Sequence, residues 1–216
     1  MFKALFILSS LMTPPVFLSR RSILQTSMIL PQYNLDGDSD SSDSSDRSFI
    51  KKINNNIYYT GPLTDESVFA ITAHLVNLQN TEGIDHINLH IQSQGGSLLP
   101  TLGLVDHIRV SDIPVNTYVK GYAASAASLV SVVGAKRFIN KHGLMLVHQL
   151  KMGLEPSKYQ ELQDQYENSE TLMSIIREIY LENTNISPEK LDYLLKHDYW
   201  LNSTTCKEYG FIDIVM

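Results

Sequence analysis

The sequence predicts an α/β domain with a largely parallel sheet covered by helices on both sides. Two kinds of pattern alternate along the chain: short apolar runs typical of strands, and amphipathic stretches with the helical period. Gly-containing turns separate several of them. Strands that alternate with helices pair in parallel. Functional side chains are expected where the carboxyl ends of such strands meet.

The folded part is expected over residues 49–216, after two segments of different composition. Residues 1–35 contain no Asp or Glu and include an apolar run that is too short to span a bilayer. They indicate a targeting leader with secretory and transit-like features, or alternatively a disordered tail. A plastid stroma is the favoured location and the cytoplasm is the alternative. Residues 36–48 are rich in Ser and Asp and predict a disordered linker.

In the first half of the domain we expect a strand at 57–59, a helix at 64–79, a strand at 87–91 and a helix that begins near Leu98. Thr64 is a suitable N-cap, because Asp and Glu follow it in the first turn. Alternating apolar residues define the strand at 87–91, and Gly95-Gly96 follows it as a turn.

In the second half we expect a strand at 115–119, a helix after Ser125, a strand at 144–147, a long helix at 157–183, a helix from 187 to about 198, a short helix that ends at Gly210 and a strand at 211–215. Gly121 is expected to end the strand at 115–119. The long helix carries Tyr159, Leu162, Tyr166 and Met173 on one stripe. So much apolar surface on one helix predicts a subunit contact.

Charge and composition argue against several partners. The formal net charge is −6 and no basic patch is evident, so neither nucleic acid nor a membrane is expected as a partner. The single cysteine, Cys206, cannot form an intrachain disulfide and is expected to be buried. No metal is expected, because the following histidines lack metal-ligand spacing and suit surface or core roles: His74, His86, His90 and His107.

Several polar residues at predicted element ends suit acyl transfer. A serine nucleophile needs a base, a carboxylate that orients the base, and N–H donors for the oxyanion. Ser125 lies where a strand gives way to a helix, His148 follows an apolar strand, and Asp198 follows a short helix. Gly95-Gly96 permits close backbone approach. These residue types alone also allow a capping role for Ser125 and a structural role for His148.

Five strings then resemble motifs of the proteolytic subunits of Clp proteases, in the family's order across residues 57–216. Gly121-Tyr122-Ala123-Ala124-Ser125 resembles the nucleophile motif, and Met145-Leu146-Val147-His148-Gln149 resembles the histidine motif. His197-Asp198-Tyr199-Trp200-Leu201 is similar to the aspartate segment. Ser93-Gln94-Gly95-Gly96-Ser97 resembles the Gly-Gly turn, and Glu208-Tyr209-Gly210-Phe211-Ile212-Asp213 resembles the signature near the carboxyl end.

The resemblance implies the crotonase-like Clp protease fold, with a protruding handle helix that begins near Ser157. It also implies a triad in which Ser125 is the nucleophile, His148 is the general base and then acid, and Asp198 orients His148. The backbone N–H groups of Gly96 and Ala126 would form the oxyanion hole. Substrate would be bound by Gly95, Gly96, Ser97, Leu98 and Leu150.

The sequence departs from the family pattern at three places near these residues. Gln94 stands where a proline is usual, Ala126-Ala127 stands in place of Met-Gly, and Leu150 replaces a proline. All three groups of the implied triad are kept. The departures are expected to affect the oxyanion hole and the first substrate pocket.

The resemblance also implies an ATP-dependent serine endopeptidase that cleaves unfolded polypeptides. Its subunits, alike or mixed, would form two stacked seven-membered rings around a chamber. A Clp-type AAA+ unfoldase would thread substrates in and use the ATP, so no cofactor is expected in this chain. The alternatives are a non-catalytic ring subunit and a crotonase-type acyl-CoA enzyme. A Ser–Lys pair with Lys120 or Lys136 suits the motifs less well than His148.

Overall fold

A computed structural model of the protein describes residues 48–153 and 158–216. The elements in chain order are β1 (Phe49–Ile53), β2 (Asn56–Thr60), α1 (Asp65–Gln79), β3 (Ile87–Ser93), α2 (Leu98–Arg109), β4 (Val115–Ala124), α3 (Ala126–Val132), β5 (Arg137–Ile139), β6 (Leu144–Leu146), α4 (Tyr159–Asn183), α5 (Pro188–Leu195), β7 (Trp200–Asn202), α6 (Ser203–Glu208) and β8 (Ile214–Val215). The leader and nearly all of the linker expected over residues 1–48 lie outside the described residues.

The strands form one sheet whose main order is β1-β2-β3-β4-β5-β8. All neighbours in this order pair in parallel except β1 and β2, which confirms the predicted fold class. β4 has two partners along its length: Thr117–Val119 pairs with β5, whereas Tyr122–Ala124 pairs with β6. β6 in turn pairs antiparallel with β7. The end of β4, β6 and β7 therefore make a branch of the sheet, which we call the β4-β6-β7 branch.

The prediction that Gly121 ends a strand at 115–119 is wrong, because β4 continues through Gly121 to Ala124. The pairing register of β4 with β3 shifts between Ile91 and Ser93, so an irregularity accommodates this stretch. A Cβ at Gly121 would lie 2.8 Å from the side-chain oxygen of Gln92, which is a close approach that glycine permits. The continued strand positions the start of α3.

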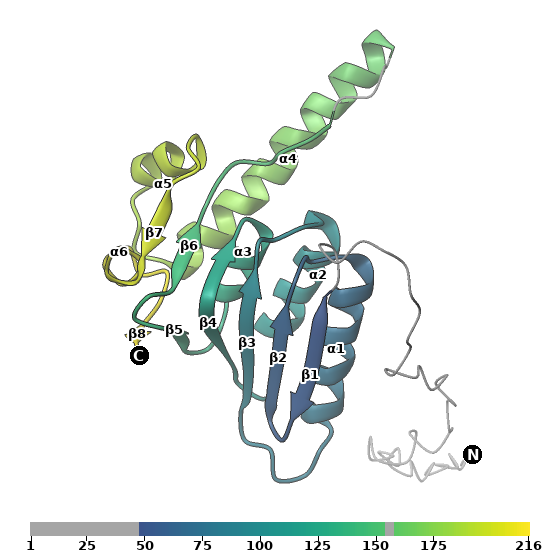
Figure 1. Cartoon of the computed structure of the whole chain (residues 1–216). Helices are drawn as coiled ribbons and strands as arrows, with labels where there is room; N and C mark the ends of the chain where they lie inside the picture. Colours follow the sequence, from purple (N-terminus) through teal and green to yellow (C-terminus); the bar gives the residue numbers. More distant parts are fainter. Residues whose placement is uncertain (1–47, 154–157) are drawn as a thin grey trace, which may run out of the picture. The chain divides into compact units, whose positions relative to one another are not determined.

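Helices α1, α2 and α3 pack against one face of the sheet (Figure 1). The start of α1 is fixed as predicted, because Thr64 and Ser67 exchange hydrogen bonds between side chain and backbone N–H at 3.2 and 2.8 Å. Fully buried aliphatic side chains fill this layer, including Ile57, Leu75, Leu89, Val105 and Ala127. Burying each large one stabilises the fold by about 1.5–3 kcal/mol.

The other face of the sheet, where helices were also expected, instead carries a row of rings from four neighbouring strands. Tyr58, His90, Tyr118 and Phe138 are paired in register, and their successive ring centroids lie 4.4, 4.7 and 4.3 Å apart. His90 is only 7% exposed, and its Nε2 donates to Asn56 Oδ1 at 2.9 Å. Burial, assisted by the positive charge of Lys120, lowers the pKa of His90 to about 4. His90 is therefore neutral at pH 7.

The long helix α4 extends beyond the sheet, as the handle expectation requires (Figure 1). Ile176, Ile179 and Tyr180 bury its second half in the core, whereas Tyr159 and Tyr166 in its first half are 78% and 66% exposed. The predicted start at 157 lies outside the described residues. Despite its 25 residues, α4 is too polar to cross a membrane, and within the described ranges no other helix combines the required length and apolar character.

Candidate active site

Ser125 lies on a strained turn between β4 and α3. Its φ is 55° and its ψ is −130°, a conformation that non-glycine residues adopt rarely and at a cost of about 1–3 kcal/mol. The N–H of Ser125 donates to the carbonyl of Leu146 at 2.8 Å. The carbonyl of Ser125 accepts from the N–H and the Oγ of Ser128 at 2.9 and 2.6 Å. The surrounding structure thus holds this backbone in place on both sides.

The Gly95-Gly96 turn has no room for a side chain at either position, and Gly95 approaches the turn of Ser125. A Cβ at Gly95 would lie 2.6 Å from the carbonyl oxygen of Ala124 and 2.7 Å from Cβ of Ser125. A Cβ at Gly96 would collide with the backbone of Leu63. Both residues have positive φ, 92° and 155°, which also favours glycine. The Gly-Gly turn therefore brings backbone to the side of Ser125.

Two backbone N–H groups near Ser125 are suited to hold an oxyanion. The bridge between Leu63 and Gly96 uses the carbonyl of Gly95 and the N–H of Ser97, at 2.9 and 2.7 Å, and leaves the N–H of Gly96 outside it. Ala126 is the first residue of α3, where a backbone N–H has no acceptor within the helix. The N–H of Ser97, by contrast, is occupied by Leu63.

The branch of the sheet brings the three predicted triad residues to one end. Ala124 pairs with Leu146, and Leu146 pairs with Trp200. Ser125 directly follows β4, His148 lies just after β6, and Asp198 lies just before β7. Because these strand ends are neighbours, residues that are far apart in the sequence approach one another there.

His148 and Asp198 are near each other but not hydrogen-bonded. Nδ1 of His148 lies 3.9 Å from Oδ1 of Asp198, which is an ion-pair distance. The His148 side chain is 20% exposed and that of Asp198 is 82% exposed. Within residues 48–153 and 158–216, no hydrogen bond joins the hydroxyl of Ser125 to His148. The groups are in the order that a triad requires, with looser contacts than in a closed triad.

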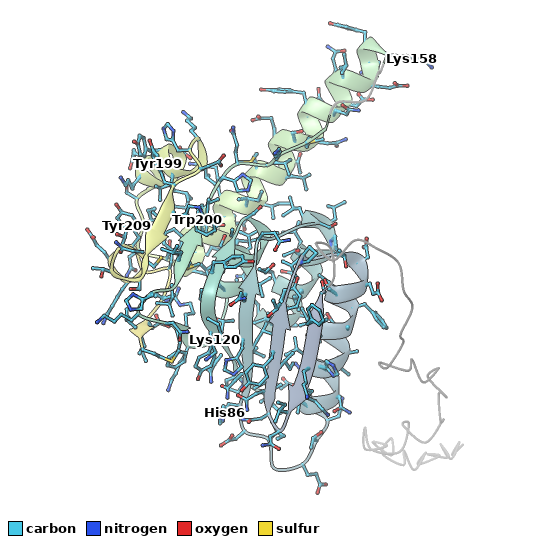
Figure 2. The ribbon with its side chains drawn as sticks, in the orientation of Figure 1. His86, Lys120, Lys158, Tyr199, Trp200 and Tyr209 are labelled. Atoms are coloured by element: carbon cyan, nitrogen blue, oxygen red, sulfur yellow. The ribbon has the colours of Figure 1, made fainter. Side chains whose placement is uncertain are left out.

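The loop of Asp198 is bordered by aromatic rings that the sequence analysis did not identify. The ring of His197 lies 4.7 Å from that of Tyr193 and stacks on Tyr199 at 4.9 Å. Tyr199 and Trp200 are labelled beside α5 and β7 in Figure 2. Tyr193 lies on α5 and His197 lies just past its end, and their spacing of four residues is the signal that would have indicated such a contact. Asp192, the nearest alternative carboxylate in sequence, is held by Arg177 through contacts of 2.7 and 3.0 Å.

Two pockets lie beside Ser125 and share it. The first, which we call the apolar pocket, has a volume of about 380 Å³ and is lined by Pro62, Gln94, Gly95, Gly96, Leu98, Ser125, Ala126, Leu129, His148, Gln149, Leu150, Lys151, Ile176 and Tyr180. The second, which we call the aromatic pocket, has a volume of about 680 Å³ and is lined by Gln94, Gly121, Tyr122, Ala124, Ser125, Leu144, Leu146, His148, Lys151, Asp198 and Trp200. An extended peptide that crosses Ser125 would meet one pocket on each side.

The apolar pocket contains most of the predicted substrate-binding residues. Gly95, Gly96, Leu98 and Leu150 line it, whereas Ser97 does not. Sequence reasoning missed Tyr180, whose buried hydroxyl contacts Ser128 Oγ at 2.7 Å. Burial raises the pKa of Tyr180, so its hydroxyl stays neutral. It also missed Lys151, which lines both pockets.

Other chemistries find less support near this site. Cys206 is fully buried, and burial raises the pKa of its thiol to about 12, so it is a poor nucleophile. Lys120 lies over the ring of Tyr118 at 5.5 Å, on the ring-bearing face of the sheet, and lines neither pocket. Among the residues that the structure describes, no group of three His, Cys, Asp or Glu side chains is placed to hold a metal ion.

Comparison with known proteins agrees with this architecture. A family model described as Clp protease matches residues 41–216. The ATP-dependent Clp protease proteolytic subunit of Streptococcus sanguinis (strain SK36) is 33% identical over 165 residues, which cover 74% of this chain and 83% of the relative. The protein of the same name from Streptococcus pneumoniae (strain Hungary19A-6) is 29% identical over 163 residues, with the same shares covered. These similarities support a Clp-type peptidase, and with the family model matching most of its length the chain belongs to the Clp protease family.

Proposed function

We propose that the chain is a serine endopeptidase that cleaves unfolded polypeptides, with Ser125 as its nucleophile. The observation that carries this proposal is the strained turn of Ser125, held against Gly95 at the boundary of two pockets that His148 also lines. A strained residue fixed from both sides is typical of a functional position. The shared pockets give a peptide access to the hydroxyl from both directions.

In the proposed mechanism, Oγ of Ser125 attacks the peptide carbonyl while His148 takes the hydroxyl proton. Nδ1 of His148 faces Asp198, which leaves Nε2 as the nitrogen for Ser125. The N–H groups of Gly96 and Ala126 stabilise the oxyanion of the tetrahedral intermediate. His148 then gives the proton to the departing amine, and water hydrolyses the acyl-enzyme by the same steps.

The test of the nucleophile is labelling with a fluorophosphonate, which modifies activated serines. The wild-type protein should be labelled at Ser125, and Ser125→Ala should lose both labelling and hydrolysis of small fluorogenic peptides. Ser174→Ala, which removes an exposed hydroxyl from α4 outside both pockets, is the matched control and should behave like the wild type. Labelling that persists in Ser125→Ala would assign the reactive serine elsewhere.

The role of Asp198 is tested separately by Asp198→Asn. We expect kcat/KM to fall by about 10²–10⁴-fold, because an amide no longer favours the correct tautomer of His148. Asp192→Asn is the control: it breaks the ion pair with Arg177 and should lower stability while leaving kcat/KM nearly unchanged. A larger catalytic defect in Asp192→Asn than in Asp198→Asn would transfer the orienting role to Asp192.

A non-catalytic ring subunit is the second candidate. The distance of 3.9 Å between His148 and Asp198, and the 82% exposure of Asp198, favour it over a fully assembled triad. In that case the protein would join rings with active paralogues, yet neither label with fluorophosphonate nor cleave peptides. The labelling experiment therefore separates the two candidates directly.

The names of the relatives include ATP dependence, and we extend this to the chain as part of the proposal. The subunits would form two stacked seven-membered rings, and a Clp-type AAA+ unfoldase would supply substrates and use the ATP. Degradation of a stably folded protein should then require both the ATPase and ATP, whereas short peptides should need neither. ATP-independent digestion of the folded protein would contradict a closed chamber that substrates enter only after they are unfolded.

A targeting leader within residues 1–35, with a plastid stroma as destination, also remains part of the proposal. The two relatives described above are bacterial, which fits the cytoplasmic alternative. Sequencing the amino terminus of the protein from its native cells decides between them. A start between residues 20 and 46 would support removal of a leader, whereas a start at Met1 would contradict it.

A further inference from the structure

We propose that Lys151 makes the site select peptide segments in which an acidic residue stands beside the apolar residue bound at Ser125. The inference rests on the proposed function only in taking the two pockets as the place where an extended peptide binds. It adds a substrate class to that site: apolar segments flanked by Glu or Asp, in preference to those flanked by Lys or Arg.

Lys151 lies at the boundary of the two pockets. It lines both of them, as Ser125 and His148 do. The backbone just before it is held: the N–H of Gln149 donates to the carbonyl of Leu195 at 2.7 Å, and the N–H of Leu150 points to Sδ of Met173 at 3.2 Å. These contacts hold the backbone just before Lys151, and the exposed cationic side chain borders the pockets on both sides of Ser125.

The apolar pocket itself should take an uncharged side chain. Leu98, Leu129 and Ile176 form much of its wall, and the buried hydroxyl of Tyr180 already shares a hydrogen bond of 2.7 Å with Ser128 behind the wall. A carboxylate placed deep in such a pocket would lose its hydration without a partner. The acidic group that Lys151 attracts therefore belongs to a neighbouring residue of the peptide.

The charges around the site favour an acidic neighbour over a basic one. Among the residues that the structure describes, the lining of the apolar pocket includes the cation of Lys151 and no carboxylate. The aromatic pocket includes Lys151 and Asp198, and the latter lies near His148. A basic side chain next to the apolar residue bound at Ser125 would be repelled by the like charge of Lys151. Interactions of this kind at a partly exposed site change relative rates by about tenfold between the two signs of charge.

The experiment uses three fluorogenic peptides that are identical except for the residues on both sides of one central leucine, which are Glu, Gln or Lys. For the wild-type protein we expect kcat/KM to be about tenfold higher for the Glu peptide than for the Lys peptide. Lys151→Gln should bring the two values close together, and Lys151→Glu should reverse their order. Lys151 is exposed, so these substitutions should not disturb folding.

Lys120→Gln is the matched control, because Lys120 lines neither pocket and lies over Tyr118 instead. Figure 2 labels Lys120 on the sheet, apart from Trp200 at the aromatic pocket. This variant should keep the wild-type ratio of Glu to Lys peptide. The inference would be overturned if Lys151→Gln left the preference in kcat/KM for the Glu peptide unchanged. It would also be overturned if Lys120→Gln removed that preference to the same extent.

A binding measurement separates this inference from the proposed function. Fluorescence anisotropy with the same peptides, labelled, on Ser125→Ala should show tighter binding of the Glu peptide, and the added Lys151→Gln should remove the difference. Preferential binding without hydrolysis by the wild type would overturn the peptidase and retain the selectivity. Hydrolysis with equal rates and equal binding, or no binding at all, would overturn the selectivity.

Discussion

At the scale of single residues, the site depends on two backbone conformations that the sequence pattern does not show by itself. Ser125 has a positive φ although it is not glycine, and Gly95 approaches it within distances that exclude a side chain. Strain at one residue persists only where its neighbours determine the conformation. The contact of the Gly-Gly turn with the nucleophile turn is such a case.

Gly95→Ala should therefore impair the site more than the fold. The new Cβ would lie 2.6 Å from the carbonyl oxygen of Ala124 and 2.9 Å from the nitrogen of Ala126, so the turn must move. We expect the rate of fluorophosphonate labelling to fall at least tenfold, and the free energy of unfolding to fall by about 1–3 kcal/mol. Labelling kinetics and urea denaturation measure the two effects.

Gly103→Ala is the control for this substitution. No atom lies within 4 Å of a Cβ at Gly103, and the residue is within α2, where alanine is about 1 kcal/mol better than glycine. This variant should be slightly more stable and fully labelled. Wild-type labelling of Gly95→Ala would mean that the turn tolerates a side chain and that its close approach does not position Ser125.

The residues of the site could be predicted from the sequence only where a local motif indicates them. Ser125, His148 and Gly95-Gly96 follow strands in recognisable strings. In the structure Ser125 and His148 line both pockets, and the two glycines line the apolar pocket. Lys151 and Tyr180 have no such motif. Their place depends on how the segment after β6 and the helix α4 pack around the pockets, which is a tertiary property. No local pattern in the sequence determines it.

At the scale of elements, long and strongly periodic segments were predicted best. The bounds of α1 and β3 and the start of α2 agree with the predictions within a few residues. The strands β1, β5 and β7 were not predicted, because they are three to five residues long and lack an alternating apolar pattern. Such strands form because their neighbours offer backbone partners. The strand predicted at 115–119 ended too early for a related reason. Glycine is expected to end a strand, but pairing with β6 extends β4 through Gly121.

The row of rings on the sheet predicts how the stability of the fold depends on pH. The pKa of His90 is lowered to about 4, below its unfolded value near 6.5, so the unfolded chain binds more protons between these values. The stability that neutral His90 contributes is therefore present above about pH 6.5 and is lost as the pH falls toward 4. His90 alone should make the fold about 1–2 kcal/mol less stable at pH 5 than at pH 7.

His90→Phe tests this pH dependence, because phenylalanine can continue the ring stack but does not titrate. Asn56 Oδ1 keeps a donor in Asn88, at 3.2 Å. The difference in unfolding free energy between pH 7 and pH 5, measured by urea denaturation, should shrink relative to the wild type by about 1–2 kcal/mol. An unchanged difference would show that His90 does not control acid sensitivity.

At the scale of the whole molecule, the exposed half of α4 is the surface that most needs a partner. Tyr159, Leu162 and Tyr166 are 78%, 42% and 66% exposed, and they follow one another at helical spacing. Lys158 marks the tip of this half in Figure 2. Burying these groups between subunits would gain about 25 cal/mol for each Å² of apolar area removed from water.

We therefore expect Tyr166→Glu to weaken assembly, because a carboxylate would have to be buried in the proposed contact. Sedimentation velocity should show a shift from large assemblies toward smaller species. Asn168→Glu adds the same charge at an exposed position two residues along the helix and away from the stripe, and it should sediment like the wild type. Identical profiles for Tyr166→Glu and the wild type would place the subunit contact elsewhere.

The pairing of Leu146 with Trp200 has a consequence for the order in which parts of the chain fold during synthesis. Strands β6 and β7 are neighbours in the sheet, yet residues 147–199, with α4 and α5, lie between them in the chain. Closing a loop of about 50 residues costs about 3.5 kcal/mol of chain entropy, in addition to a constant, so this contact should form late. A nascent chain that has not emerged past residue 200 contains Ser125 and His148 but lacks the strand that brings Asp198 to them. If the three act together as proposed, each subunit becomes able to hydrolyse peptides only after its chain has been synthesised past β7.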